Sequence, residues 1–209
     1  MGNYGFYFDA TACVGCRACQ LACKEIHDLA LGSHFRKVLD CEGGSWSVPG
    51  DGAAPVPQGL FGYHISLGCN HCMNPACVEA CPSGAMSKDA ETGIVSVDQD
   101  VCIGCRSCEK ACPYHAPSYQ EERQVMGKCD LCRDERAHGR EPACVAVCAM
   151  RALSWGDFSE LRQKHPEAVS DAPPLPSSET SPCLLIEPHV GFGAGESQEI
   201  SFPFELALV

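Results

Sequence analysis

Sixteen of the 18 cysteines in this 209-residue chain form four groups of four, and every group ends in a C-x3-C pair. The first and third groups are spaced C-x2-C-x2-C-x3-C, the second C-x2-C-x4-C-x3-C, and the fourth has eleven residues between its second and third cysteines. In chain order the groups are Cys13, Cys16, Cys19 and Cys23; Cys69, Cys72, Cys77 and Cys81; Cys102, Cys105, Cys108 and Cys112; and Cys129, Cys132, Cys144 and Cys148. Cysteine at this density indicates a disulfide scaffold or metal sites.

The residues around the groups repeat as well. Cys13-Val-Gly-Cys16-Arg17 matches Cys102-Ile-Gly-Cys105-Arg106, and Pro75-Ala-Cys77-Val78 matches Pro142-Ala-Cys144-Val145. The order is therefore A, B, A, B, which indicates a duplicated unit.

The spacing matches the chemistry of iron–sulfur cubes. A C-x2-C-x2-C loop wraps three thiolates around one cube through tight turns whose backbone N–H groups point at the sulfurs. The fourth cysteine leads away and ligates a different cube, often with proline after it. Pro82 and Pro113 keep that proline, whereas Lys24 and Ala149 replace it, which weakens the signature without removing a ligand.

The segment between the second and third groups predicts how the groups pair. Residues 84–98 read as a short strand, a turn ending in Gly93 and an alternating strand, the hairpin that joins two cysteine loops in a small ferredoxin. We therefore pair the second group with the third and, by elimination, the first with the fourth. The predicted clusters are Cys13/Cys16/Cys19/Cys148, Cys129/Cys132/Cys144/Cys23, Cys69/Cys72/Cys77/Cys112 and Cys102/Cys105/Cys108/Cys81.

Other readings of the cysteines fit less well. Zinc sites use paired C-x2-C ligands, whereas three close cysteines and a distant fourth suit a cube. Disulfides between neighbouring C-x2-C cysteines have awkward geometry, and the first residues show no export signal. Cys41 and Cys183 lie outside the groups and read as free buried thiols, with a disulfide between them as the alternative. His71 does not indicate a Rieske centre, because its group keeps all four cysteines.

Charge excludes further classes. Twenty-seven acidic residues against 15 basic ones give a net charge of −12, so no nucleic-acid partner is expected. No apolar run approaches the roughly 18 residues of a membrane span, so no direct membrane insertion is expected. Four cations flank cysteines and either raise cluster potentials or are solvated: Arg17, Lys24, Arg106 and Lys128. The 45% hydrophobic content includes the cysteines, and this thin core makes folding dependent on the clusters.

Local patterns predict the remaining elements in the first half of the chain. Leu21–Asp28 predicts a helix and His64–Leu67 a strand that enters the second group. Gly43–Gly62 is rich in glycine and proline and predicts a long surface loop.

The end of the chain predicts a helix and a tail. Asp157–Lys164 predicts a short helix, and the prolines and serines of Asp171–Pro182 predict an extended segment. Beyond it, Cys183–Ile186 and Ile200–Phe204 are apolar, so we expect the tail to lie against a partner.

Four motifs carry a family resemblance: Cys102-Ile-Gly-Cys105-Arg106, Cys112-Pro-Tyr114, Cys81-Pro-Ser-Gly-Ala85 and Gly127-Lys-Cys129-Asp130. With the order of the groups, they resemble the four-cluster ferredoxin subunits of molybdopterin oxidoreductases. Within that family the chain is most similar to the iron–sulfur (beta) subunits of dimethyl sulfoxide reductases. All sixteen cysteines are present, which implies four [4Fe-4S] clusters. Ala149, Cys41 and Cys183 depart from the family pattern.

The resemblance implies an α+β fold with two ferredoxin-like modules, long loops and an extended C-terminal tail. The first module would comprise residues 1–62 and 121–156, the inserted second module residues 63–120, and the short helix and partner-binding tail residues 157–209. The chain would relay electrons between a quinol-oxidising membrane anchor and a molybdopterin catalytic subunit. It would associate with the membrane through these partners, exported with a twin-arginine partner or otherwise cytoplasmic. No catalytic site stands out in the sequence, so the chain is expected to be non-catalytic. A soluble polyferredoxin serving several enzymes and a zinc scaffold are the alternatives.

Overall fold

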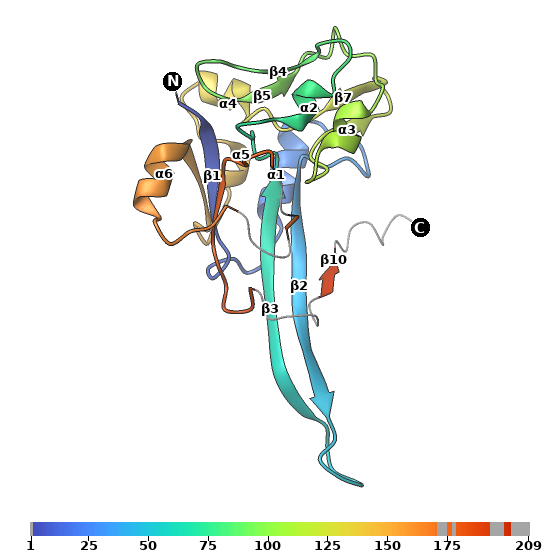
Figure 1. The fold of residues 1–209 in the computed structure, drawn as a ribbon, viewed down its shortest axis with the longest axis vertical. Coiled ribbons are helices and arrows are strands. Elements are labelled where there is room, and N and C mark those ends of the chain that lie inside the picture. Colours follow the sequence, from blue (N-terminus) through green and yellow to red (C-terminus); the bar gives the residue numbers. More distant parts are fainter. Residues whose placement is uncertain (1, 171–174, 177–178, 193–198, 202–209) are drawn as a thin grey trace.

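The computed structural model describes residues 2–170, 175–176, 179–192 and 199–201. Short helices and loops gather in a compact body, and one long hairpin projects from it (Figure 1). In chain order the elements are β1 (Tyr4–Asp9), α1 (Ala18–Ile26), β2 (Arg36–Ser47), β3 (Val56–Gly68), α2 (Ala76–Glu79), β4 (Met86–Lys88), β5 (Val95–Val97), α3 (Ser107–Ala111), β6 (Ser118–Gln120), β7 (Val125–Gly127), α4 (Arg133–Ala137), α5 (Ala143–Ala146), β8 (Leu153–Asp157), α6 (Phe158–Lys164), β9 (Leu184–Glu187) and β10 (Glu199–Ser201).

A three-stranded sheet with β1 at its centre lies between two layers of the core. β1 pairs antiparallel with β8 and parallel with β9. Its side chains alternate between the two layers: Phe6 and Phe8 pack into the main core, and Tyr7 packs against Phe158 and Leu161 of α6. A strand buried on both faces has an uninterrupted apolar sequence, which explains why this strand reads as Tyr-Gly-Phe-Tyr-Phe.

The same sheet corrects the expectation for the Cys183–Ile186 segment. This segment does not lie against a partner, because Leu184, Leu185 and Ile186 are buried in the protein's own sheet beside β1. Its apolar character reflects a central location in this fold. Part of the predicted tail, namely residues 171–174, 177–178, 193–198 and 202–209, lies outside the described residues.

The Gly43–Gly62 segment is not a surface loop, and this prediction was wrong. It forms the outer part of a β2–β3 hairpin whose register runs from Arg36 opposite Gly68 to Ser47 opposite Val56. Glycine and proline weaken a strand pattern, yet both are tolerated in a two-stranded ribbon, where each strand has a free edge. The predicted His64–Leu67 strand is confirmed as the inner part of β3.

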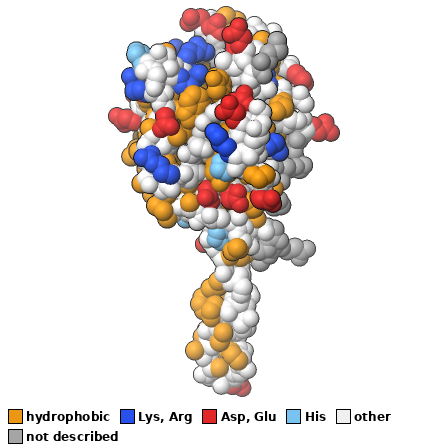
Figure 2. Space-filling model, turned by 90° about the vertical axis from the view of Figure 1, so that its left-hand side faces the viewer, with side chains coloured by type: hydrophobic (Ala, Val, Ile, Leu, Met, Phe, Trp, Pro, Cys, Tyr) orange, Lys and Arg blue, Asp and Glu red, His pale blue; other side chains and the backbone are white. Residues whose placement is uncertain are grey.

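The projecting hairpin is apolar and nearly uncharged. Figure 2 shows hydrophobic side chains recurring along it, and Trp46, Val48 and Leu60 are exposed. Asp51 is the single charged residue between positions 43 and 62. β10 pairs with β2 closer to the body, at Asp40–Glu42.

Two local predictions are confirmed. β4 and β5 form the hairpin expected between residues 84 and 98, with Met86 opposite Val97 and Gly93 at a φ of +69° in the turn. The predicted Asp157–Lys164 helix is α6, whose first N–H groups bond to the carboxylate of Asp157, the N-cap. The predicted Leu21–Asp28 helix exists but begins and ends earlier, at Ala18–Ile26.

Helix packing follows the sequence repeat. α1 packs against α5, and α2 packs against α3. The main hydrophobic cluster includes five group cysteines among its buried members: Cys19, Cys23, Cys69, Cys129 and Cys144. No helix in the described part of the chain is long and apolar enough to span a membrane.

Candidate metal centres

The first and third cysteine groups share one backbone conformation. Gly15 and Gly104 have φ angles of +65° and +67°, and the arginines that follow the second cysteine, Arg17 and Arg106, have φ angles of 59° and 61°. A left-handed arginine is uncommon, so its occurrence at both repeats shows that the tight turn is built into the motif. Each arginine is the N-cap of a helix that carries the third cysteine.

Backbone N–H groups donate to several of the cysteine sulfurs, two of them from strands outside the cysteine loops. The N–H groups of Met86 and Met126 donate to Cys81 Sγ and Cys102 Sγ at 3.3 and 3.4 Å. The N–H of Leu131 donates to Cys129 Sγ at 3.4 Å. Such bonds stabilise thiolates and tune the potential of an iron–sulfur centre.

In each group the third and fourth cysteines lie four residues apart, and the third lies on a helix. Residues at this spacing lie on one helical face, about one turn apart. In the first group both cysteines lie on α1, so this helix can present one thiol to each of two neighbouring sites. In the other groups the fourth cysteine lies one or two residues beyond the helix that carries the third: Cys81 after α2, Cys112 after α3 and Cys148 after α5.

Two of the predicted quartets line small cavities. One cavity is bordered by Cys13, Cys16, Cys19 and Cys148, and the other by Cys81, Cys102, Cys105 and Cys108. Burial is the main cause that raises the pKa of Cys13, and the charges of Cys19, Cys148 and Cys16 add to it. Four thiols that face one another in this way need positive charge before they can all ionise.

The other two quartets are buried more deeply. Burial, with the charges of Cys144, Cys132 and Cys19 adding to it, raises the pKa of Cys23 to about 12. Burial likewise raises the pKa of Cys77 to about 12, with contributions from Cys69, Cys112 and Cys72. The pKa of Cys129 also rises through burial, and its charge neighbours include both Cys23 and Cys69. The interaction between Cys129 and Cys69 therefore indicates that these two quartets are neighbours.

How closely the thiols converge determines whether they could bind a single metal ion such as zinc. Among the described residues, no three His, Cys, Asp or Glu side chains converge closely enough to hold a single metal ion. A zinc site would require four ligand atoms within about 2.3 Å of one ion.

Buried donors beside the thiols test whether an iron–sulfur cluster fits. Arg36 Nη2, Asn70 Nδ2 and His71 Nε2 are buried and have no hydrogen-bond partner among the described residues. Nδ1 of His71 accepts the Val95 N–H at 3.0 Å, so the ring is neutral and its proton lies on Nε2. Buried unpaired donors are costly, and an anionic group rich in sulfur supplies acceptors for them. The residues therefore fit such clusters.

Comparisons with known proteins agree with this chemistry. Residues 60–158 match a 4Fe-4S dicluster domain, and residues 10–26 match a 4Fe-4S binding domain. The sequence is 46% identical over 187 residues to the B chain of anaerobic dimethyl sulfoxide reductase from Escherichia coli, covering 90% of this protein and 89% of the relative. The match to the corresponding B chain of Haemophilus influenzae is 44% over 189 residues, covering 90% and 91%. The protein belongs to the family of dimethyl sulfoxide reductase B chains.

The B chain of polysulfide reductase from Wolinella succinogenes is also similar, at 37% identity over 193 residues, covering 90% of this protein and 95% of the relative. As a member of the dimethyl sulfoxide reductase family of B chains, the protein is an iron–sulfur protein of electron transport.

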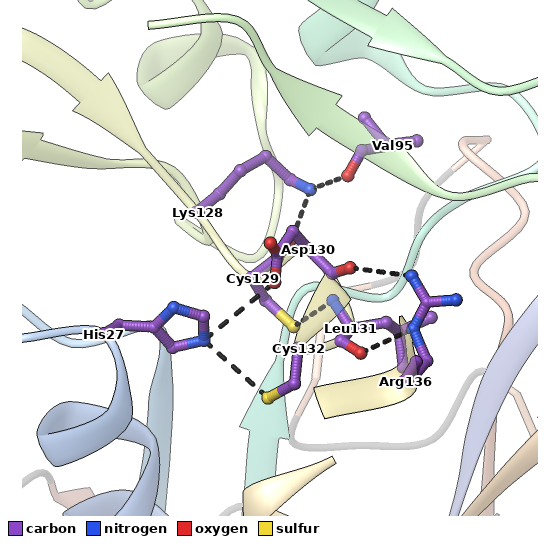
Figure 3. Close-up of polar contacts among 8 residues, drawn as sticks. All are labelled: His27, Val95, Lys128, Cys129, Asp130, Leu131, Cys132 and Arg136. Atoms are coloured by element: carbon purple, nitrogen blue, oxygen red, sulfur yellow. Dashed lines mark hydrogen bonds and ion pairs between the residues drawn. The ribbon is translucent and has the colours of Figure 1, made fainter. Parts of the chain in front are cut away.

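The family motif Gly127-Lys-Cys129-Asp130 places a buried cation between the two inner quartets. Lys128 is 4% exposed, and its Nζ donates to the carbonyl oxygens of Val95 and Cys129 (Figure 3). Its charge lowers the thiol pKa of Cys77, Cys112 and Cys129 against the larger effect of burial. Of the four flanking cations, Lys128 is the one that is buried.

A second contact in Figure 3 orders the turn of the fourth group. Nε2 of His27 lies 3.8 Å from Cys132 Sγ and 4.0 Å from a carboxylate oxygen of Asp130. The guanidinium of Arg136 donates to the carbonyl oxygens of Leu131 and Asp130 at 2.8 and 3.4 Å. These bonds hold a turn in which Leu131 and Cys132 both have positive φ.

The other two cysteines are buried thiols outside the four quartets, although Cys183 lies near the third quartet, because the charges of Cys72 and Cys69 contribute to its raised pKa. Cys41 lies on β2 in the main core, and Cys183 lies beside Tyr7 and Leu185 in the smaller core. Both are free, so no disulfide joins them. Burial is the main cause that raises each pKa to about 11.

Sequence reasoning missed Arg36 and Ser66. Arg36 is 3% exposed and bonds to Ser66, whose hydroxyl lies 3.3 Å from Cys19 Sγ. Neither residue is next to a cysteine in the sequence, and only the pairing of β2 with β3 brings them to the first group. No local signal could have found them.

Proposed function

We propose that this chain holds four [4Fe-4S] clusters and relays electrons between a quinol-oxidising membrane anchor and a molybdopterin catalytic subunit of a dimethyl sulfoxide reductase-like complex. The first cluster would use Cys13, Cys16, Cys19 and Cys148; the second Cys129, Cys132, Cys144 and Cys23; the third Cys69, Cys72, Cys77 and Cys112; and the fourth Cys102, Cys105, Cys108 and Cys81. The two thiol-lined cavities and the electrostatic neighbours of the buried thiols support this assignment.

The proposed clusters follow one another in a line. α1 carries one thiol of the first cluster and one of the second, and the segments that start at α5, α2 and α3 and continue to the fourth cysteine of their groups likewise divide their thiols between two clusters. Cys129 and Cys69 interact electrostatically, which supports adjacency of the second and third clusters. Each cluster takes up and gives back one electron, and the protein holds it in a fixed place beside the next.

The observation that carries the proposal is the exposure of the two ends of this line. Cys16 of the first cluster and Cys105 of the fourth are exposed, whereas all four cysteines of the second are buried. Large apolar residues lie exposed beside both ends, Val14 at 59% and Ile103 at 66%. A relay between two proteins needs two accessible ends and an insulated middle, and this distribution meets that need.

We further propose two ferredoxin-like modules, with residues 1–62 and 121–156 in the first and residues 63–120 in the second. The packing of α1 on α5 and of α2 on α3 supports this division. The pairing of β9 with β1 extends the first module, so part of residues 157–209 belongs to its core.

The partners follow from the relatives, which are named as B chains of dimethyl sulfoxide and polysulfide reductases. Such a name implies at least one further subunit, and we assign the chemistry on the substrate to a molybdopterin subunit. Membrane association would then occur through the anchor subunit.

The test is anaerobic purification of the tagged protein from its native host, followed by measurement of iron, sulfide, molybdenum and co-purifying proteins. We expect about sixteen irons and sixteen sulfides per chain, together with a stoichiometric molybdenum-bearing subunit and a membrane protein. Full iron with no molybdenum and no partner would overturn the bridging role and favour a mobile polyferredoxin. Zinc in place of iron would overturn the cluster assignment.

A further inference from the structure

A buried arginine lies between the thiols of the first and second proposed clusters. Arg36 is the first residue of β2 and is 3% exposed. Its Nη1 donates to both the carbonyl oxygen and the hydroxyl of Ser66 at 3.1 Å, and its guanidinium carbon lies 4.5 Å from the centre of the Phe6 ring. These contacts fix the position of the charge.

The described residues offer this arginine no carboxylate. None of the ion pairs among them involves Arg36, and its Nη2 has no hydrogen-bond partner there. A buried guanidinium normally has a counter-charge, because its hydration is otherwise lost without compensation.

The acidic groups that face Arg36 are thiols. Burial opposes its charge, but the thiolates of Cys144, Cys19, Cys129 and Cys23 outweigh burial and raise the pKa of the guanidinium. Cys19 belongs to the proposed first cluster, and the other three belong to the second.

Ser66 adds a directional contact to the first cluster. Its Oγ accepts from Arg36 Nη1, so its own proton is available to Cys19 Sγ at 3.3 Å. Gly68 leaves the space that the guanidinium occupies, because a Cβ at that position would lie 3.2 Å from Arg36 Nη2. The pocket is therefore shaped for a guanidinium.

We propose that Arg36 is the shared counter-charge of the first and second clusters, a positioning residue that favours their reduced forms. The inference rests on the proposed function. Reduction adds one negative charge to a cluster, and a fixed cation in a low-dielectric interior stabilises that charge and raises the reduction potential. One cation between two clusters also weakens their mutual repulsion, which keeps both reducible within one relay.

The test is a set of Arg36 variants in the purified complex, with potentials measured by dithionite titration followed by electron paramagnetic resonance. In Arg36→Gln we expect the reduction equilibrium constants of both clusters to fall at least tenfold, which is about 59 mV for a one-electron couple. Arg36→Lys keeps the charge and is expected to restore most of the potential. Arg162→Gln removes an exposed charge on α6 and should leave all potentials unchanged.

A second pair of variants covers the case in which Arg36→Gln loses its clusters. Gly68→Asp introduces a carboxylate beside Nη2, and Gly68→Asn introduces the same shape without charge. We expect lower potentials in the Asp variant than in the Asn variant for the first two clusters. Equal potentials in this pair, or unchanged potentials in iron-replete Arg36→Gln, would overturn the inference.

The same samples separate the two proposals. Iron, sulfide and molybdenum are measured in the wild-type complex first. If that complex lacks about sixteen irons or the molybdenum subunit, the proposed function fails. If it has both and the variants leave the potentials unchanged, only the role of Arg36 fails.

Discussion

Arg17 and Arg106 have the same left-handed backbone conformation, with φ angles of 59° and 61°, although they lie in different cysteine groups. Each lies two residues after a glycine of positive φ and directly before a helix. The helix after Arg17 carries both the third and the fourth cysteine of its group, whereas the helix after Arg106 carries the third and ends just before the fourth. The duplication in the sequence is therefore also a duplication of backbone geometry. This backbone conformation sets the positions of the backbone N–H groups and of the thiols, so substitutions at its residues test its role.

The turn at Gly104 should not tolerate a side chain. Gly104 has a φ of +67°, and a Cβ there would lie 2.3 Å from the carbonyl oxygen of Gln124. We expect Gly104→Ala to lose iron from the fourth cluster and to lower the unfolding temperature. Gly139→Ala is the control, because Gly139 has a φ of +72° with open space around it. Its cost should be the backbone term alone, about 1–2 kcal/mol. Equal effects of the two substitutions would contradict the steric argument.

Cys112 tests the crossing of ligands between the second and third groups. We expect Cys112→Ser to lose the cluster held by Cys69, Cys72 and Cys77, because the charge of Cys112 is among the causes that raise the pKa of Cys77. Iron should fall by about four per chain, and the resonance signal of the third cluster should disappear. Loss of the cluster held by Cys102, Cys105 and Cys108 would contradict the assignment of Cys112 to the third cluster.

Cys41 and Cys183 should be dispensable for cluster binding. Neither is a ligand in the proposed assignment, so Cys41→Ala and Cys183→Ala should retain full iron, whereas Cys23→Ala should not. Each thiol has a pKa raised from 9 to about 11, so its thiolate fraction at pH 8 is about a hundredfold lower than that of an ordinary cysteine. Alkylation of the intact protein by iodoacetamide should therefore be slow at pH 8 and accelerate toward pH 11. Rapid labelling of either residue at pH 8 would refute this.

Lys128 should set the potential of the third cluster. Lys128→Met removes a buried charge near Cys77 and Cys112, so the potential of this cluster should fall by about 59 mV or more, a tenfold change in its equilibrium constant. Arg106→Met removes a side chain that is 52% exposed and paired with Glu109, and it should have little effect. A larger fall in reduction potential in the Arg106 variant than in the Lys128 variant would show that burial of the cation does not control its effect on the potential. Electron paramagnetic resonance titration measures both.

Removal of iron should abolish cooperative unfolding. The main core is built partly from cysteines, among them Cys19, Cys23 and Cys144, so its packing depends on what they bind. We expect the apo-protein to show no sharp transition in differential scanning calorimetry. A single cooperative peak without iron would show that the hydrocarbon core suffices.

Local chemistry could be predicted from the sequence wherever neighbouring residues decide it. The turns at Gly15 and Gly104, the hairpin through Gly93 and the helix capped by Asp157 all depend on residues within a few positions of each other. For that reason these elements matched their predictions, and the fourfold spacing indicated the cluster chemistry. The bounds of α1 differed by two or three residues, because helix ends depend on neighbours in space.

Long-range pairing decided the rest. Gly43–Gly62 lacks strand alternation, and only register with the opposite strand makes it a hairpin. Cys183–Ile186 has the composition of a contact surface, and only its place beside β1 makes it a core strand.

The sequence by itself determined that the protein carries thiols in iron–sulfur spacing, because that spacing is a property of short loops. The tertiary structure alone decided that Arg36 lies among Cys19, Cys23 and Cys144, since two strands must pair before that charge reaches the thiols. The kind of cofactor can therefore be predicted from local sequence. The electrostatic environment of that cofactor comes from residues that only the fold brings together.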